Sequence, residues 1–124
     1  MKTALIVEDN PVNRELLREL LEMRGFTVTE ACDGKEALDE IRHSKPDIVL
    51  LDLNMPVVDG FEAVKRIRAE ASLAALPVLA VTAYAMRGDK ERILKSGFDG
   101  YLSKPISPQD LESELQRLLQ KAVC

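Results

Sequence analysis

The stretch that decides the fold is Ile48-Val49-Leu50-Leu51-Asp52, four consecutive apolar residues followed directly by an acid. The run does not alternate with polar residues, which is typical of a strand buried on both faces of a parallel sheet. Two similar apolar runs lie at residues 4–7 and 78–81. Residues 26–31 alternate more and predict an edge strand, and Gly100–Ser103 form a short fifth candidate.

Helical patterns separate these strands. Over residues 10–24 the sequence predicts a helix with Asn10 as its N-cap, Pro11 at its first position and Gly25 after its end. Its apolar stripe consists of Val12, Leu16, Leu17, Leu20 and Leu21. Four more helices are predicted after Asp33, over residues 61–71, over residues 87–96 and after Ser107.

Five strand–helix pairs in alternation predict one α/β domain over residues 1–124, with helices on both faces of a parallel sheet. Right-handed crossovers leave few topologies, and the flavodoxin-like, doubly wound strand order 2-1-3-4-5 is the one we expect. In such a sheet the functional crevice lies beyond the carboxyl ends of the strands, between the first strand and the third.

Polar residues follow the predicted strands at this edge. Glu8 and Asp9 follow the first strand, Asp52 the third, Thr82 the fourth and Lys104 the fifth. Carboxylates that converge repel one another unless a cation lies among them, and a hard oxygen site of this kind suits Mg²⁺. A lysine can neutralise a phosphate oxygen and an aspartate can attack phosphorus. The set therefore indicates phosphoryl chemistry.

Four segments of the sequence resemble the signature blocks of response-regulator receiver domains. They are Leu-Ile-Val-Glu-Asp-Asn at 5–10, Leu-Leu-Asp-Leu-Asn-Met-Pro-Val-Val-Asp-Gly at 50–60, Val-Thr-Ala at 81–83 and Tyr-Leu-Ser-Lys-Pro-Ile at 101–106. The resemblance covers essentially the whole chain. Residues 82–89 are most similar to the receivers of hybrid kinases and of small cell-division regulators of the DivK type.

The resemblance implies a role for each matching residue. Asp52 is expected to accept the phosphoryl group. Mg²⁺, for which Mn²⁺ can substitute, is expected to bind Asp9, Asp52 and the backbone carbonyl of Asn54, with Glu8 acting through a water molecule.

Lys104 is expected to contact the phosphoryl group, Thr82 to move toward it and Tyr101 to change rotamer. The peptide bond between Lys104 and Pro105 is expected to be cis, because Lys104 must point into the site while the chain turns away. The expected donor is a histidine kinase or a histidine phosphotransfer protein, and the output is binding to a downstream protein through the fourth helix, fifth strand and fifth helix.

Two surfaces are predicted to bind partners. The start of the first helix lies next to Asp52 and mixes apolar and polar chemistry, as a transient interface does. The residues expected to dock the donor there are Val12, Asn13 and Arg14. The surface expected to change on phosphorylation includes Met86, Arg87, Lys90 and Ile93.

Composition excludes several other classes. The net charge of −4 is spread without a basic stripe, so we expect no nucleic-acid partner. No apolar run reaches the roughly 20 residues of a membrane span, and the N-terminus does not resemble a signal peptide, so we expect a cytoplasmic protein without a membrane partner. Cys32 is predicted to be a small buried residue and Cys124 a terminal thiol.

Three alternatives fit less well. A phosphohydrolase with an aspartate nucleophile needs a second acid two residues later, where this chain has Asn54. A flavodoxin-like electron carrier needs a phosphate loop rich in Ser, Thr and Gly, which residues 10–13 are not. Intact Asp9, Asp52, Thr82 and Lys104 argue against a module that is never phosphorylated. We therefore expect a switch that catalyses only its own phosphorylation and dephosphorylation, not a conventional enzyme.

Overall fold

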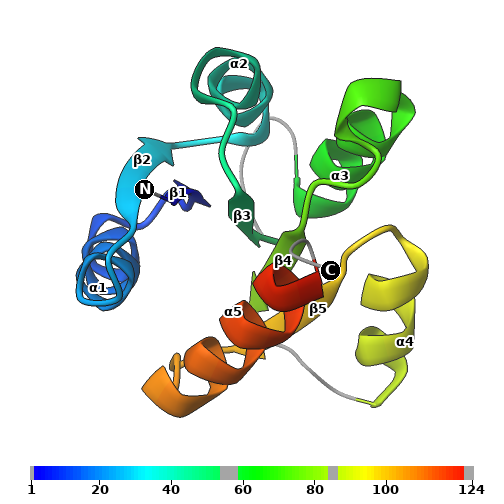
Figure 1. The fold of residues 1–124 in the computed structure, drawn as a ribbon. Coiled ribbons are helices and arrows are strands. Elements are labelled where there is room, and N and C mark those ends of the chain that lie inside the picture. The colour runs from blue at the N-terminus through cyan, green and yellow to red at the C-terminus, as the bar shows by residue number, and fades with distance from the viewer. Residues whose placement is uncertain (1, 54–58, 84–86, 122–124) are drawn as a thin grey trace.

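The computed structural model describes residues 2–53, 59–83 and 87–121 of the chain. Its centre is one five-stranded parallel sheet in the order β2-β1-β3-β4-β5 (Figure 1). The strands are β1 (Thr3–Val7), β2 (Thr27–Ala31), β3 (Ile48–Asp52), β4 (Val78–Thr82) and β5 (Gly100–Ser103). The predicted strand order is confirmed, and β2 lies at an edge of the sheet, as its alternating sequence indicated.

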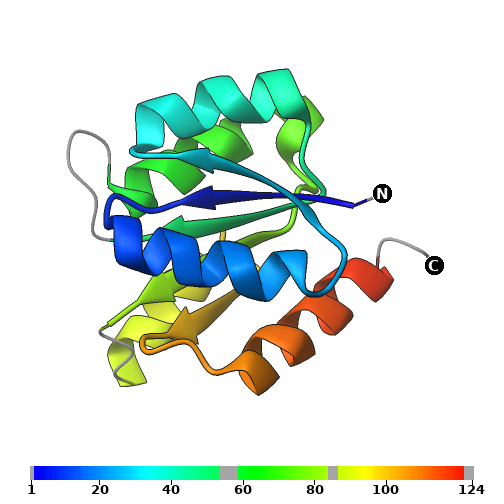
Figure 2. The same ribbon diagram turned by 90° about the vertical axis from the view of Figure 1, so that its left-hand side faces the viewer.

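Helices cover both faces of the sheet (Figures 1 and 2). One face carries α1 (Pro11–Glu22) and α5 (Pro108–Lys121), and the other carries α2 (Gly34–Ser44), α3 (Gly60–Ala69) and α4 (Arg87–Lys95). The third helix ends earlier than predicted, at Ala69, because Glu70 has an extended backbone. The chain then forms a short 3₁₀ helix, η1 (Ala71–Leu73).

The apolar residues form one buried cluster on each face of the sheet. Every residue of β3 and β4 is buried, which explains why their sequences do not alternate. The apolar stripe of α1 is narrower than predicted. Leu17 and Leu21 are buried, whereas Val12 is 74% exposed and Leu16 is 43% exposed. Because α1 packs on β1 and the edge strand β2, only one line of its apolar residues reaches the sheet.

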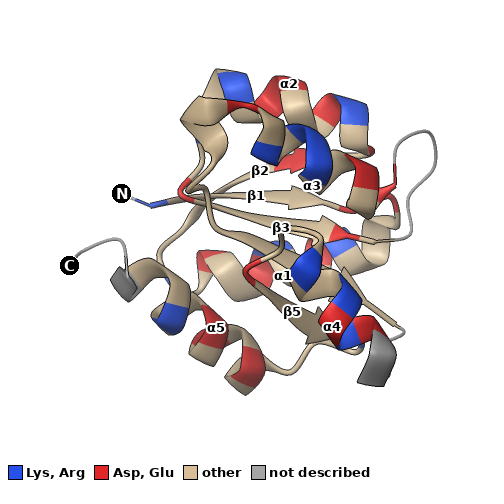
Figure 3. Cartoon of the chain, turned by 90° about the vertical axis from the view of Figure 1, so that its right-hand side faces the viewer, with Lys and Arg blue, Asp and Glu red and all other residues tan. Residues whose placement is uncertain are grey.

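The surface of the helices carries charges of both signs. Figure 3 shows acidic and basic residues interspersed on α2, α3 and α4. Arg42 of α2 forms an ion pair with Glu70, which joins the two neighbouring helices at their C-terminal ends. Within the described ranges, no helix combines the length and the apolar character that crossing a membrane requires.

The strand register places the site residues at one edge. Val7 of β1 lies opposite Leu51 of β3, Asp52 lies opposite Val81 of β4, and Thr82 lies opposite Ser103 of β5. Parallel strands run in the same direction, so the residues that follow these positions leave the sheet on the same side. The carboxyl edge of the sheet therefore gathers the polar residues that the sequence analysis singled out.

Candidate functional site

Three carboxylates meet where β1 and β3 end. Oxygen atoms of Glu8, Asp9 and Asp52 all lie within 4.8 Å of one another. Glu8 is 1% exposed and Asp52 is 4% exposed, whereas Asp9 faces solvent. Oxygen ligands that are partly buried and open to water on one side fit a hard divalent cation such as Mg²⁺, which retains several of its water molecules.

Lys104 brings a positive charge to the two buried carboxylates. Its Nζ lies 3.3 Å from Oδ2 of Asp52, and 3.2 Å and 3.4 Å from the two carboxylate oxygens of Glu8. The backbone N–H of Lys104 donates to the carbonyl of Thr82 at 2.8 Å, which ties the end of β5 to the end of β4. The peptide bond between Lys104 and Pro105 is cis, the isomer expected from the sequence.

Burial and charge shift two of these groups from their ordinary ionisation. Burial raises the pKa of Glu8 from 4.5 to about 7, with the hydrogen bond and the negative charge of Asp52 adding to the rise. Burial alone lowers the pKa of Lys104, but the charges of Asp52 and Glu8 outweigh it and hold that pKa above its usual value. The site thus concentrates negative charge that is only partly neutralised, as expected of a place that receives a cation.

Comparison with known proteins shows which family has this arrangement of residues. The family model of the response regulator receiver domain matches residues 4–116. The chain belongs to this family. A response regulator that controls polar differentiation, DivK of Brucella anthropi, is 44% identical to this receiver domain over 113 residues, which cover 90% of the chain and 92% of that protein.

Solved structures agree with this assignment. A response regulator from Chloroflexus aurantiacus has a TM-score of 0.91 and 34% identity, and covers 96% of this receiver domain and 98% of that chain. The receiver domain of a sensor histidine kinase from Pseudomonas aeruginosa has a TM-score of 0.88 and 37% identity, and covers 96% and 98%. That structure contains a magnesium ion coordinated in its active-site cleft. Two-component signalling is therefore the context of this domain.

The two residues predicted to switch belong to β4 and β5 of the receiver domain. Thr82 ends β4 and is 1% exposed. Tyr101 in β5 is half-buried against the core cluster that α2, α3 and α4 cover. The Nζ of Lys90 on α4 lies 5.4 Å from the centroid of the Tyr101 ring, within the range of a cation–π contact. One side of the ring is therefore covered by a charged side chain of the neighbouring helix.

The residues predicted to dock a phosphoryl donor divide into two groups. Val12 points into solvent, as a docking residue should. Asn13 and Arg14 turn toward the site instead. The amide Nδ2 of Asn13 donates to Oε1 of Glu8 at 3.2 Å, and Nη1 of Arg14 donates to the carbonyl of Glu8 at 3.0 Å.

Two predictions about exposure are wrong. Ile93 was expected on the surface of α4, but it is fully buried, because it is the apolar residue through which this mostly charged helix packs on the sheet. Cys32 was expected to be buried, but it is exposed, because it follows the last residue of β2 where the chain leaves the sheet.

Some predicted residues fall outside the described part of the chain. The metal ligand proposed at the backbone of Asn54 and the surface residue Met86 both lie in undescribed segments. Arg87 begins α4, and its side chain is not described.

One residue that supports the site was not singled out from the sequence. Gly60 begins α3, and its N–H donates to the carbonyl of Leu53 at 3.1 Å. A Cβ atom at this position would lie 2.7 Å from the backbone oxygen of Asp52 and 2.7 Å from Cα of Leu53. The close approach of α3 to the end of β3 therefore requires glycine. The only hint in the sequence was its place at the end of the block over residues 50–60.

Proposed function

We propose that this receiver domain takes a phosphoryl group on Asp52 from a phosphohistidine of a histidine kinase or a histidine phosphotransfer protein, and that it then binds a downstream protein. The observation that carries the proposal is the buried carboxylate of Asp52, which lies 3.3 Å from the ammonium of Lys104 and belongs to one cluster of carboxylates with Glu8 and Asp9. In this proposal residues 1–124 form a single receiver domain that acts in the cytoplasm, with no nucleic acid and no membrane as partner.

The transfer makes one bond and breaks one bond. A carboxylate oxygen of Asp52 bonds to phosphorus while the phosphorus–nitrogen bond of the donor breaks, and the imidazole nitrogen leaves with the bonding electron pair. Lys104 is in position to neutralise an oxygen of the incoming group. Water later hydrolyses the acyl phosphate and restores the free carboxylate. The domain thus catalyses steps on itself only, unlike a conventional enzyme.

The acidic cluster supports a requirement for Mg²⁺. Asp9 and Asp52 would hold the ion directly and Glu8 would do so through water, with the backbone carbonyl of Asn54, outside the described residues, as a further ligand. When bound, Mg²⁺ neutralises charge on the phosphoryl oxygens. Mn²⁺ prefers similar oxygen ligands and can substitute.

The response is proposed to reach the face formed by α4, β5 and α5. The hydroxyl of Thr82 turns toward the new phosphoryl oxygens, and Tyr101 moves into the space behind it. A groove of about 380 Å³ on this face is lined by residues that include Lys90, Tyr101 and Glu114. Movement of Tyr101 would change this groove and the contact with Lys90, and we infer that Met86 and Arg87 belong to the same surface.

The donor is proposed to dock at the start of α1, beside the loop at Pro105. Val12 and Leu16 form an exposed apolar strip on α1 that a partner can cover. The sequence analysis placed Asn13 and Arg14 in the same surface. Because both reach inward to Glu8, they would lie beneath the edge of the strip formed by Val12 and Leu16.

The test uses a small phosphodonor. Incubation with acetyl phosphate and Mg²⁺ should add one phosphoryl group to the wild type, detected by mass spectrometry of the intact protein. Asp52→Asn should take none, while Asp39→Asn, the same chemical change on the exposed side of α2, should be labelled like the wild type. Labelling of Asp52→Asn at the wild-type level would show that the phosphoacceptor is a different residue.

A further inference from the structure

The carboxylate of Glu8 is held by a side chain from the start of α1, that of Asn13. Oε1 of Glu8 accepts from Nδ2 of Asn13 at 3.2 Å and from Nζ of Lys104 at 3.2 Å. Lys104 is shared, because the same Nζ also lies 3.3 Å from Asp52. Among the contacts of the described residues, the amide of Asn13 donates to Glu8, whereas Lys104 is divided between Glu8 and Asp52.

The backbone of Glu8 is held by the next residue of the same helix turn. Nη1 of Arg14 donates to the carbonyl of Glu8 at 3.0 Å and lies 3.7 Å from Sγ of Cys32. Nε of Arg14 pairs with Oε1 of Glu30 on β2 at 3.2 Å, and the arginine side chain is only 21% exposed. A guanidinium with one partner on β2 and another on the residue that follows β1 has few free rotamers, so the carbonyl of Glu8 is fixed relative to the sheet.

The start of α1 is itself built to hold this geometry. The side chain of Asn10 accepts from the backbone N–H of Val12 at 2.9 Å and of Asn13 at 3.2 Å. An N-cap of this kind fixes the direction of the first turn. The turn then points the side chains of Asn13 and Arg14 back toward β1, onto the residue that follows it.

We propose that Asn13 and Arg14 are positioning residues that orient Glu8 toward the cation bound beside Asp52. The inference rests on the proposed function, because it assigns these residues to the metal site of the phosphorylation reaction and not to donor docking. During transfer Lys104 turns to the phosphoryl group, and the amide of Asn13 keeps the carboxylate of Glu8 in place. Removing a side chain that orients a direct metal ligand commonly lowers metal affinity about 10-fold to 100-fold, and because Glu8 acts through water the effect of Asn13 should not exceed the lower end of that range.

The test compares two amide-to-leucine changes of matched chemistry. Asn13→Leu removes the donor to Glu8 and keeps a similar volume. Gln116→Leu removes the Nε2 of Gln116, which donates to Glu112 at 3.1 Å on the exposed side of α5, far from the site. Mg²⁺ affinity is measured by calorimetric titration of the unphosphorylated full-length proteins, so the readout does not depend on phosphoryl transfer.

We expect Asn13→Leu to bind Mg²⁺ about 10-fold more weakly, and Gln116→Leu to bind it like the wild type. Arg14→Met should weaken binding in the same direction, and it serves as the second variant if Asn13→Leu is poorly folded by circular dichroism. At saturating Mg²⁺ the labelling rate of Asn13→Leu with acetyl phosphate should approach that of the wild type, because the lost step is cation binding.

The outcomes separate this inference from the proposed function. Unchanged Mg²⁺ affinity in both Asn13→Leu and Arg14→Met overturns the inference. If, in addition, these variants accept a phosphoryl group more slowly from a phosphohistidine protein, the two residues belong to the docking surface instead. A wild type that binds Mg²⁺ but takes no phosphoryl group overturns the proposed function and leaves the positioning role intact. A wild type that binds no Mg²⁺ overturns both.

Discussion

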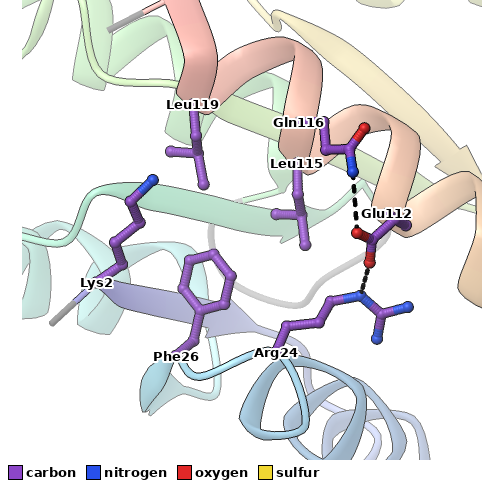
Figure 4. Close-up of a pocket in the computed structure, with 7 residues that line it drawn as sticks. All are labelled: Lys2, Arg24, Phe26, Glu112, Leu115, Gln116 and Leu119. Atoms are coloured by element: carbon purple, nitrogen blue, oxygen red, sulfur yellow. Dashed lines mark hydrogen bonds and ion pairs between the residues drawn. The ribbon is translucent and has the colours of Figure 1, made fainter. Parts of the chain in front are cut away.

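The two ends of the sheet differ in how their charged side chains are paired. At the carboxyl edge Glu8 and Asp52 are buried, and one ammonium, that of Lys104, serves both. At the amino edge Arg24 of the turn after α1 pairs with Glu112 of α5, whose side chain is 45% exposed (Figure 4). This pair lines a pocket of about 360 Å³ together with residues that include Phe26 and Leu115, and Figure 4 shows these side chains.

The difference indicates which end serves function. The pair of Arg24 and Glu112 matches one cation with one anion, and although Arg24 is only 22% exposed, Glu112 is 45% exposed and keeps contact with water. The amino edge therefore has no unbalanced charge that a ligand would have to neutralise. Buried carboxylates that outnumber their cation are unfavourable for folding, since each loses hydration and repels the other. Such a cluster is expected where a bound ligand supplies the missing positive charge. The predictions below test this contrast, from the largest expected effect to the smallest.

The first prediction concerns pH. The pKa of Glu8 rises from 4.5 in the unfolded chain to about 7 in the fold, so the folded protein holds a proton that the unfolded chain releases. Its stabilising effect is complete below pH 4.5 and is lost as the pH rises through about 7. Each tenfold change in acid dissociation corresponds to about 1.4 kcal/mol, so the whole effect is on the order of 3 kcal/mol.

Chemical denaturation of the metal-free protein across this pH range measures the effect. Glu8→Gln, which carries no titrating proton, should show a clearly flatter dependence of its unfolding free energy on pH. If the wild type and Glu8→Gln follow parallel curves, the carboxylate of Glu8 is not the group that links folding to pH in this range.

The second prediction removes the shared cation. Lys104→Met leaves Glu8 and Asp52 without a counter-charge while keeping most of the side-chain volume. Losing one partner of a buried ion pair costs about 3–5 kcal/mol when the remaining charge is fully enclosed. Here the loss should be roughly 2 kcal/mol, because Lys104 is 22% exposed and Glu8 can take up a proton. Urea denaturation above the pKa of Glu8 measures it.

Added Mg²⁺ provides the control for this variant. A bound divalent cation replaces the missing charge, so Mg²⁺ should restore more stability to Lys104→Met than it adds to the wild type. A variant that is as stable as the wild type without metal would contradict the view that Lys104 offsets buried repulsion.

The sequence alone predicted the parts of the molecule that follow from periodicity and direction. Unbroken apolar runs identified β3 and β4 because strands covered on both faces need no polar positions. Once the sheet is parallel, the residues after the strands must gather at one edge, and Glu8, Asp9, Asp52 and Lys104 do so. The roles of these residues in metal binding and phosphoryl transfer remain predictions.

What the sequence did not predict depends on side-chain direction and on distances between elements. Ile93 was expected in the surface that changes on phosphorylation, yet its position in α4 turns it to the core. Asn13 and Arg14 look like surface residues in a polar helix start, and only the capped first turn shows that they reach Glu8. Gly60 is required by the separation of the α3 and β3 backbones, which no local pattern encodes.

The last prediction concerns the amino edge and has the smallest effect. In Arg24→Met the methionine keeps an apolar stem in the pocket that Arg24 and Phe26 line, and Glu112 returns to water without leaving a buried charge. The guanidinium also donates to the carbonyl of Leu20 at 2.9 Å in a part-buried bond and to the carbonyl of Pro108 at 3.2 Å in an exposed one. The loss should therefore be about 1 kcal/mol, smaller than in Lys104→Met, because Glu112 can regain water when the guanidinium is removed.

A double-mutant cycle with Glu112→Gln isolates the interaction between Arg24 and Glu112 from the other contacts of Arg24. Urea denaturation of the two single variants and the double variant should give a coupling free energy that shrinks further in high salt, because exposed charges are screened. Labelling by acetyl phosphate should not change, since the pair lies at the end of the sheet opposite Asp52. A stability loss in Arg24→Met as large as in Lys104→Met would mean that both edges bury their charges alike, and the contrast between them would carry no information about function.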